Sequence, residues 1–209
     1  MAVPDHSIDP RILECAKQEF LSLGYEKASL KHICEEAGVT TGALYKRYKG
    51  KDDLFAAVVS DTITALDTET KKRTDVDVHA MSDQQLTGAW DMNAGMRQWF
   101  QFLYGLKEGF TLLVKCSAGS SYSNFEHEFV EKMCVGTYSY YREAYRRGLA
   151  KYDISPEEMH IILSAFWQTV YEPFIHDFDW TKLKIHCATV NRLFDWYGML
   201  GIPNTDTLP

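Results

Sequence analysis

Residues 30–54 read LKHICEEAGVTTGALYKRYKGKDDL, and the fold of the chain is inferred outward from this stretch. Ser29 can supply an N-cap oxygen to a short helix, and Gly38 is the residue type that ends helices in the left-handed conformation. Thr40 can cap a second helix after one intervening residue, Val39. Two short helices joined by such a tight, glycine-containing turn predict a helix-turn-helix unit.

A third helix is predicted upstream of this unit. It begins near Pro10, a favourable first helical residue, and ends at Gly24. Its apolar side chains recur at a spacing near four, as one buried face requires: Ile12, Leu13, Ala16, Phe20 and Leu23. Downstream, Asp52 and Asp53 lie at the positive end of another, longer helix. Residues 1–51 are therefore expected to form a head of three helices.

The remaining residues, 52–209, are expected to form a larger helical body. Apolar positions recur with a period near 3.6 and strand-like alternation is absent, so the fold class is all-α with about nine helices in total. Ser155 and Pro156 give an N-cap and a first-turn proline, which predict a helix start. A polar loop is expected over 71–81, and one continuous final helix over 179–200.

Charge is distributed unevenly along the chain, which has a formal net charge of −7. Residues 1–51 contain eight basic and seven acidic side chains, whereas residues 52–209 contain 14 basic and 22 acidic ones. Within 27–51, six basic residues face only two acids. The overall charge argues against wholesale coating of nucleic acid or anionic membrane, but the positive charge is concentrated where it could face phosphate.

The five cysteines predict no disulfide framework and no zinc module. They are odd in number, lie far apart and include no C-x-x-C pair. Residues 1–10 lack a basic segment followed by an apolar run, and no stretch reaches about 18 uncharged apolar residues. We therefore expect a reduced cytoplasmic protein with no metal, no cofactor and no association with membranes.

Between Arg11 and Phe55, the sequence resembles the TetR/AcrR family of transcriptional regulators. The matching elements are an Ala-Gly-Val turn, a glycine and an apolar-Tyr pair in the next helix, an aromatic residue, and Lys with two acids opening the following helix. Here these are Ala37-Gly38-Val39, Gly42, Leu44-Tyr45, Tyr48, Lys51 and Asp52-Asp53. The resemblance implies a ligand-responsive repressor that binds a near-palindromic double-stranded operator as a homodimer. Residues 1–51 would be its DNA-binding domain, and residues 52–209 its effector-binding and dimerisation domain.

The second helix of the unit must turn one side to its own head and the other to DNA. Leu44 and Tyr48 lie four residues apart and can share the inner side. Lys46 is the best candidate for a guanine contact, and Arg47 and Lys51 are expected on flanking phosphates. The predicted DNA-contacting residues are Ser29, Lys31, Thr40, Thr41, Gly42, Ala43, Tyr45, Lys46, Arg47 and Lys51.

Two sets of residues in the body have both a structural and a functional interpretation. Aromatic side chains there belong to the core or line a pocket for an unknown small molecule: Trp99, Phe102, Phe110, Tyr138, Tyr141, Phe166, Trp167 and Tyr171. A heptad-like seam suits pairing with a second chain or packing on its own domain: Leu183, Cys187, Val190, Phe194 and Tyr197.

Catalytic and metal sites find little support in the sequence. Glu157 and His160 match only half of a di-iron helix motif. The cluster of His176, Asp177 and Asp179 could bind a cation or be a solvated turn between helices. No Gly-rich phosphate loop or Ser/His/Asp arrangement can be placed, so an enzyme is not expected. An enzyme with a helical body and a protein-interaction module that does not bind an operator are the alternatives.

Overall fold

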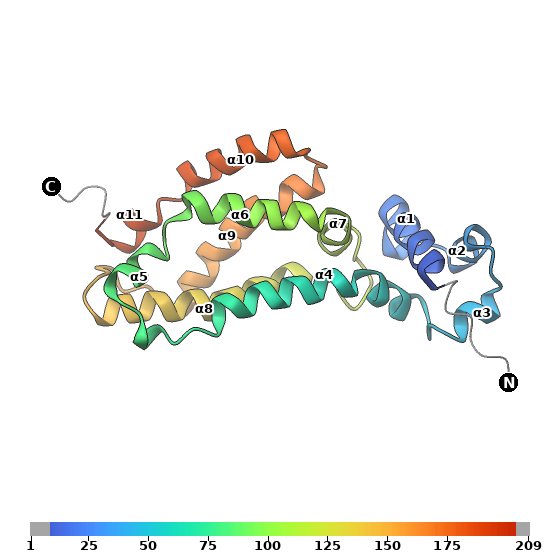
Figure 1. The fold of residues 1–209 in the computed structure, drawn as a ribbon, viewed down its shortest axis with the longest axis horizontal. Coiled ribbons are helices and arrows are strands. Elements are labelled where there is room, and N and C mark those ends of the chain that lie inside the picture. The colour runs from blue at the N-terminus through green and yellow to red at the C-terminus, as the bar shows by residue number, and fades with distance from the viewer. Residues whose placement is uncertain (1–8, 204–209) are drawn as a thin grey trace. The chain divides into compact units, whose positions relative to one another are not determined.

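The computed structural model describes residues 9–203, except for the side chains of residues 93 and 94. Within this range every regular element is a helix (Figure 1), which confirms the all-α prediction. The chain forms two compact units. The N-terminal unit comprises residues up to 66 and residues 106–126, and the C-terminal unit comprises 67–105 and the residues from 127 onward.

The N-terminal unit contains the predicted head and adds segments from beyond residue 51. Its helices are α1 (Asp9–Lys27), α2 (Leu30–Ala37), α3 (Thr41–Tyr45), the first part of α4 (Lys51–Thr74) and α7 (Lys107–Lys115). Residues beyond the head join it because Phe55 of α4 packs against Phe20, with ring centroids 5.0 Å apart, and the backbone N–H of Tyr25 donates to the carbonyl of Cys116 at 2.8 Å. Gly24 has φ 75°, so the chain leaves helical geometry where the sequence predicted an end.

The C-terminal unit contains the rest of α4 and most of the remaining helices: α5 (Asp83–Gly88), α6 (Met92–Gly105), α8 (Phe125–Arg146), α9 (Pro156–Ile175), α10 (Trp180–Leu193) and α11 (Trp196–Leu200). A 3-10 turn lies between α4 and α5 at Val78–Ala80. Ser155 caps α9 as predicted, because its Oγ accepts a hydrogen bond from the backbone N–H of Glu158 at 3.1 Å. Figure 1 shows α10 beside α6, on which it packs.

A proline is accommodated inside α9 by a side chain from α10. Pro173 has no N–H to donate to the carbonyl of Thr169, four residues earlier. His186 of α10 lies with its Nε2 2.7 Å from that carbonyl oxygen. A carbonyl only accepts hydrogen bonds, so Nε2 carries the proton. The helix ends two residues after the proline, at Ile175, and the contact joins α9 to α10.

Two predicted element boundaries were wrong. The loop expected over 71–81 begins later, because α4 continues to Thr74 and places basic side chains in its last turn, where the helix dipole favours them. The final helix is interrupted at Phe194, whose ψ is 91°. A further break, at Leu106 with ψ 16°, separates α6 from α7. These two breaks explain why the helices of the described residues number more than about nine.

The segment between α4 and α5 is anchored by charge. Glu143 of α8 is buried and accepts hydrogen bonds from Arg146 at 2.6 Å and from Arg147 at 2.7 Å. These guanidinium groups hold the pKa of Glu143 far below its ordinary value. Arg147 also donates to the carbonyls of Met81, at 2.7 Å, and His79, at 3.0 Å. The buried carboxylate of Glu143 therefore holds the side chains of Arg146 and Arg147 in place. Arg147 in turn holds the 3-10 turn between α4 and α5.

None of the helices in the described part of the chain combines the length and the apolar character needed to cross a bilayer.

Candidate nucleic-acid interface

The turn between α2 and α3 is built as the sequence predicted. Gly38 has φ 61° and ψ 38°, and its backbone N–H bonds to the end of α2. Thr40 caps α3, because its Oγ1 accepts from the N–H of Ala43 at 3.1 Å. Leu44 is completely buried, and this anchors α3 on the head. One side of α3 is thereby fixed inward and the other side faces solvent.

The outward side of α3 carries the residues expected to meet DNA. Tyr45 is 57% exposed, which excludes a core role for this tyrosine. Thr41, Gly42 and Lys46 are exposed as well. Lys46 has no ion-pair partner among residues 9–203, so its charge is available to a phosphate or a base.

The packing of the head has room for a side chain at the position of Gly42. A Cβ built at this position would have as its nearest neighbour the Oγ1 of Thr40, at 3.9 Å, which is an ordinary contact. The packing of the N-terminal unit would therefore tolerate a side chain there. The open space at Gly42 suits the close approach of another molecule.

Arg47 and Lys51 already have partners within the head. Arg47 donates from Nε to Asp9 and from Nη1 to the carbonyl of Ala43, at 3.1 Å, and its side chain is only 16% exposed. Lys51 donates to the carbonyls of Glu26 at 2.9 Å and Ala28 at 3.2 Å. These contacts stabilise the head, and contact of Arg47 and Lys51 with phosphate stays a prediction.

The start of α2 is tied to α1 by a buried carboxylate. Ser29 caps α2 with its Oγ, which accepts from the N–H of His32 at 3.3 Å. Glu19 of α1 accepts from the N–H of Ser29 at 3.0 Å and bonds to Nδ1 of His32 at 2.8 Å. Lys31, next to this cluster, is exposed and lies 3.7 Å from Glu35. Two DNA contacts were predicted at this end of α2. Lys31 is exposed to solvent, whereas Ser29 caps the helix.

The contact between Glu19 and His32 makes the stability of the head depend on pH. The hydrogen bond to Glu19 raises the pKa of His32 above its ordinary value. This contribution is fully present below the unfolded-state pKa of about 6.5 and is lost as pH rises through the folded-state pKa. In urea unfolding at a series of pH values, His32→Gln should flatten the loss of stability on going from acid to neutral pH.

The matched control for this prediction is His127→Gln. His127 is a half-exposed histidine of α8 that pairs with Glu131 and touches neither His32 nor Glu19. It should leave the pH profile of the N-terminal unit unchanged. A His32→Gln profile that overlays the wild-type profile would show that the Glu19 contact does not contribute to stability.

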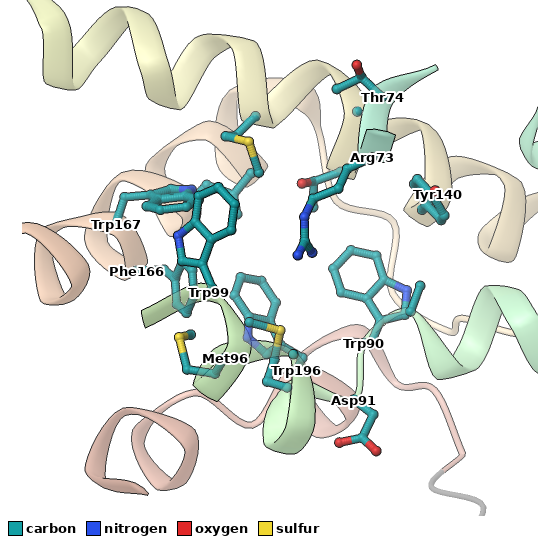
Figure 2. Close-up of a pocket in the computed structure, with 17 residues that line it drawn as sticks. Arg73, Thr74, Trp90, Asp91, Met96, Trp99, Tyr140, Phe166, Trp167 and Trp196 are labelled. Atoms are coloured by element: carbon teal, nitrogen blue, oxygen red, sulfur yellow. The ribbon is translucent and has the colours of Figure 1, made fainter. Parts of the chain in front are cut away.

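The C-terminal unit contains a cavity of about 260 Å³ (Figure 2). Three of the aromatic residues predicted for a pocket line it: Trp99, Phe166 and Trp167. The others lie outside its lining: Phe102, Phe110, Tyr138, Tyr141 and Tyr171. Of these, Phe110 belongs to the N-terminal unit, and Tyr141 is a core residue whose hydroxyl donates to the carbonyl of Tyr152 at 2.6 Å.

Several residues that line this cavity were not predicted from the sequence. Trp90 and Trp196 form part of its wall, and Arg73 reaches into it. Arg73 was missed because residues 71–81 were expected to be a loop, and Trp196 because the last helix was expected to be continuous. Spacing along a helix could not have grouped them, since they come from α4, α11 and the residues just before α6.

The predicted dimer seam is largely covered by its own chain. Leu183, Cys187 and Val190 are buried within the C-terminal unit, where α10 packs on α6. Phe194 and Tyr197 lie beyond the end of α10, so the seam is not one continuous stripe. Leu183, Cys187 and Val190 therefore pack within the subunit, whereas Phe194 and Tyr197 are half-buried.

The cluster at residues 176–179 has roles in local structure. Asp179 caps α10 by accepting from the N–H of Lys182 at 2.8 Å, and His176 lies 3.2 Å from Glu172. Asp177 adopts a positive φ of 54° at the turn. Within the described residues, no group of three or more His, Cys, Asp or Glu side chains is arranged to hold a metal ion.

Comparison with solved structures relates the fold to known regulators. A TetR-like transcriptional regulator from Rhodococcus sp. RHA1 matches with a TM-score of 0.62 at 16% identity, over 96% of this chain and 100% of that one. NalD of Pseudomonas aeruginosa, the secondary repressor of the MexAB-OprM multidrug efflux pump, matches with a TM-score of 0.62 at 19% identity, over 91% and 97%. FadR of Bacillus subtilis, solved in complex with stearoyl-CoA, matches with a TM-score of 0.58 at 16% identity, over 88% and 96%.

Comparison of sequences gives a more specific result for the head. No curated protein sequence matches the chain. Residues 12–58, however, match the family described as bacterial regulatory proteins, tetR family. This segment includes α2, the turn at Gly38 and the exposed side of α3. Residues 12–58 are therefore similar to the helix-turn-helix domain of the tetR family of bacterial regulatory proteins.

Proposed function

We propose that this protein is a ligand-responsive repressor that binds a near-palindromic operator as a homodimer. The observation that carries the proposal is the outward side of α3, where Tyr45 and Lys46 are exposed beside the open space at Gly42. Residues 1–51 would then act as the DNA-binding domain, and residues 52–209 as the effector-binding and dimerisation domain.

Each exposed residue of α3 has a distinct role in this proposal. Lys46 donates to the O6 and N7 acceptors of a guanine in the major groove. Tyr45 places its ring against the sugar-phosphate backbone and its hydroxyl on a phosphate, while Gly42 lets the backbone of α3 approach the duplex. In a two-fold symmetric dimer, two copies of α3 enter successive major grooves about 34 Å apart. The operator is then a near-palindrome.

The surface proposed for dimerisation lies on the exposed sides of α9 and α10. Ile161 of α9 is 62% exposed and Ile185 of α10 is 67% exposed, although both are large apolar residues. Small side chains lie near them on the same exposed sides, at Ala165 and Ala188, and allow close helix packing. The two helices are already joined by the contact of His186 with Thr169. The partner we propose for this surface is a second copy of the chain.

Charge placed on this surface should separate the dimer. Ile161→Glu combined with Ile185→Glu buries two carboxylates per subunit in an apolar interface, which is strongly unfavourable. Light scattering coupled to size-exclusion chromatography should report a folded monomer. Val135→Glu is the control, because Val135 is an exposed apolar residue of α8 in the same unit, and it should leave the dimer intact. A double variant that remains dimeric would place the interface elsewhere.

Release of the operator by a small molecule is the regulatory part of the proposal. The cavity of the C-terminal unit is the proposed effector site, and Arg73 and Thr74 of α4 line it. The same helix begins at Lys51, the last residue of the proposed DNA-binding domain. A ligand that binds more tightly to the form with low DNA affinity shifts the equilibrium toward that form, and DNA weakens ligand binding equally. The fold shared with NalD and FadR supports this assignment.

The proposal is tested by selecting bound duplexes from fragmented DNA of the source genome. Purified full-length protein is incubated with the fragments at moderate salt, and the retained fragments are sequenced. The expected result is a small set of fragments that share a near-palindrome with half-sites about one helical turn apart. Retention of fragments without a common sequence would contradict an operator-binding regulator.

A further inference from the structure

The cavity of the C-terminal unit contains one charged side chain that points into it. Arg73 comes from the last turn of α4, and its guanidinium lies 5.1 Å from the centroid of the Trp99 ring. Figure 2 shows the guanidinium in the space between Trp99 and Trp90, while Asp91 points away from the cavity. The charge that a ligand meets inside this cavity is therefore positive.

Arg73 is only loosely paired within the protein. Its Nη2 lies 3.5 Å from Oε1 of Glu69, four residues earlier on α4, and the Arg73 side chain is partly exposed. Such exposed pairs within a helix contribute little and are easily exchanged for a better partner. A guanidinium presents five donors in a planar fork that matches the two oxygens of a carboxylate. The guanidinium of Arg73 can therefore donate hydrogen bonds to the carboxylate of an anionic ligand.

The size and lining of the cavity restrict the ligand further. Its volume of about 260 Å³ lies just below the range of roughly 300–1,000 Å³ for sites of drug-sized ligands. Much of its wall is aromatic side chains and methionines, including Met96 and Met133. This suits a compact apolar or aromatic body, and it is too small for a molecule such as the stearoyl-CoA found with FadR.

We propose that the effector is a small aromatic or aliphatic carboxylic acid, whose apolar body fills the cavity and whose carboxylate pairs with Arg73. This inference rests on the proposed function, which makes the cavity the effector site. A cationic ligand would place its charge against Arg73 in a cavity with no inward-pointing carboxylate among the residues labelled in Figure 2. Binding of the acid also fixes the last turn of α4.

The test uses three probes that share one apolar body: 3-phenylpropionate, 3-phenylpropionamide and 3-phenylpropylamine. Binding to the full-length protein without DNA is measured by titration calorimetry at neutral pH and checked by quenching of tryptophan fluorescence. We expect saturable binding of 3-phenylpropionate, with an affinity on the order of tenfold or more above that of the amide and the amine. Equal affinities, a preference for the amine, or no saturable binding of the acid would overturn the proposal.

Substitution at Arg73 tests the pairing itself. Arg73→Gln should weaken binding of 3-phenylpropionate on the order of tenfold and leave the amide unchanged, and Arg73→Lys should recover part of the loss. Arg142→Gln is the control, because Arg142 pairs with Asp153 outside the cavity lining. Far-UV circular dichroism confirms that each variant folds. An Arg73→Gln protein that binds the acid as tightly as wild type would overturn the pairing.

This experiment separates the ligand class from the regulatory proposal. If 3-phenylpropionate binds as expected but does not lower affinity for a selected duplex, the ligand class stands and control of DNA binding through the cavity fails. If the protein binds its selected duplex but none of the probes, the ligand class fails and the DNA-binding proposal stands.

Discussion

A chain in which Tyr45 and Lys46 are both replaced by alanine is expected to lose specific DNA binding while it folds normally. Tyr45, the last residue of α3, and Lys46, which follows it, are both exposed, so their removal leaves no cavity in the head. Loss of a base contact costs about 1–3 kcal/mol, and loss of a phosphate contact adds a smaller, sequence-independent amount. Together these lower affinity on the order of 100-fold for the selected duplex. Fluorescence anisotropy with that duplex, labelled at one end, measures the change.

The control for this variant is a matched pair in the other unit. Tyr152 is 56% exposed, and Lys151 beside it is an exposed lysine between α8 and α9. Tyr152→Ala combined with Lys151→Ala removes the same two side-chain types and should leave the affinity for DNA within about twofold, since surface substitutions rarely exceed about 0.5 kcal/mol. Unchanged affinity of the variant at Tyr45 and Lys46 would reject the assigned face of α3.

Phe55→Ala is expected to have the largest effect on stability in the N-terminal unit. Phe55 is fully buried, and its ring packs edge-on to Phe20, at 5.0 Å, and to Tyr25, at 5.5 Å between centroids. Tyr122 adds a third aromatic contact at 6.0 Å. Truncation of a buried phenylalanine to alanine leaves a cavity and costs about 3–5 kcal/mol. This loss of stability affects the packing between α1 and the start of α4.

Hydrogen exchange locates this loss in the structure. Peptides from α1 and α2 should lose protection in the Phe55→Ala protein, while peptides from α9 should change much less, because α9 belongs to the other compact unit. Asp61→Ala, at an exposed position on the same helix, is the control and should change protection very little. Equal loss of protection in both units would show that they unfold as one.

Local signals in the sequence predicted the head accurately. Gly38 ends α2 in the left-handed conformation, and Thr40 caps α3 through its side chain, as their residue types and spacing indicate. Ser155 and Pro156 set the start of α9 in the same way. Each of these features depends on residues within a few positions of one another. This is why sequence alone could place the helix-turn-helix.

Features that depend on distant contacts were predicted less well. The sequence suggested Arg47 for phosphate, but Asp9, 38 residues away, provides it with a partner inside the head. The pocket residues were proposed mainly from the family resemblance, because periodicity does not separate pocket from core, whereas Arg73 and Trp196 come together only through tertiary packing. The break at Phe194 interrupts a regular heptad pattern, because Asp195 starts a new helix by accepting from the N–H of Gly198 at 2.9 Å.

We expect the exposed side of α3 to read a specific sequence in double-stranded DNA. The most direct test compares the Kd of the wild-type protein for its selected duplex with the Kd for a scrambled duplex of the same length, across a series of salt concentrations. We predict a preference for the selected duplex of about 1,000-fold or more near physiological salt, with affinity that falls as salt rises. Equal affinity for both duplexes, or binding that does not respond to salt, would contradict the account.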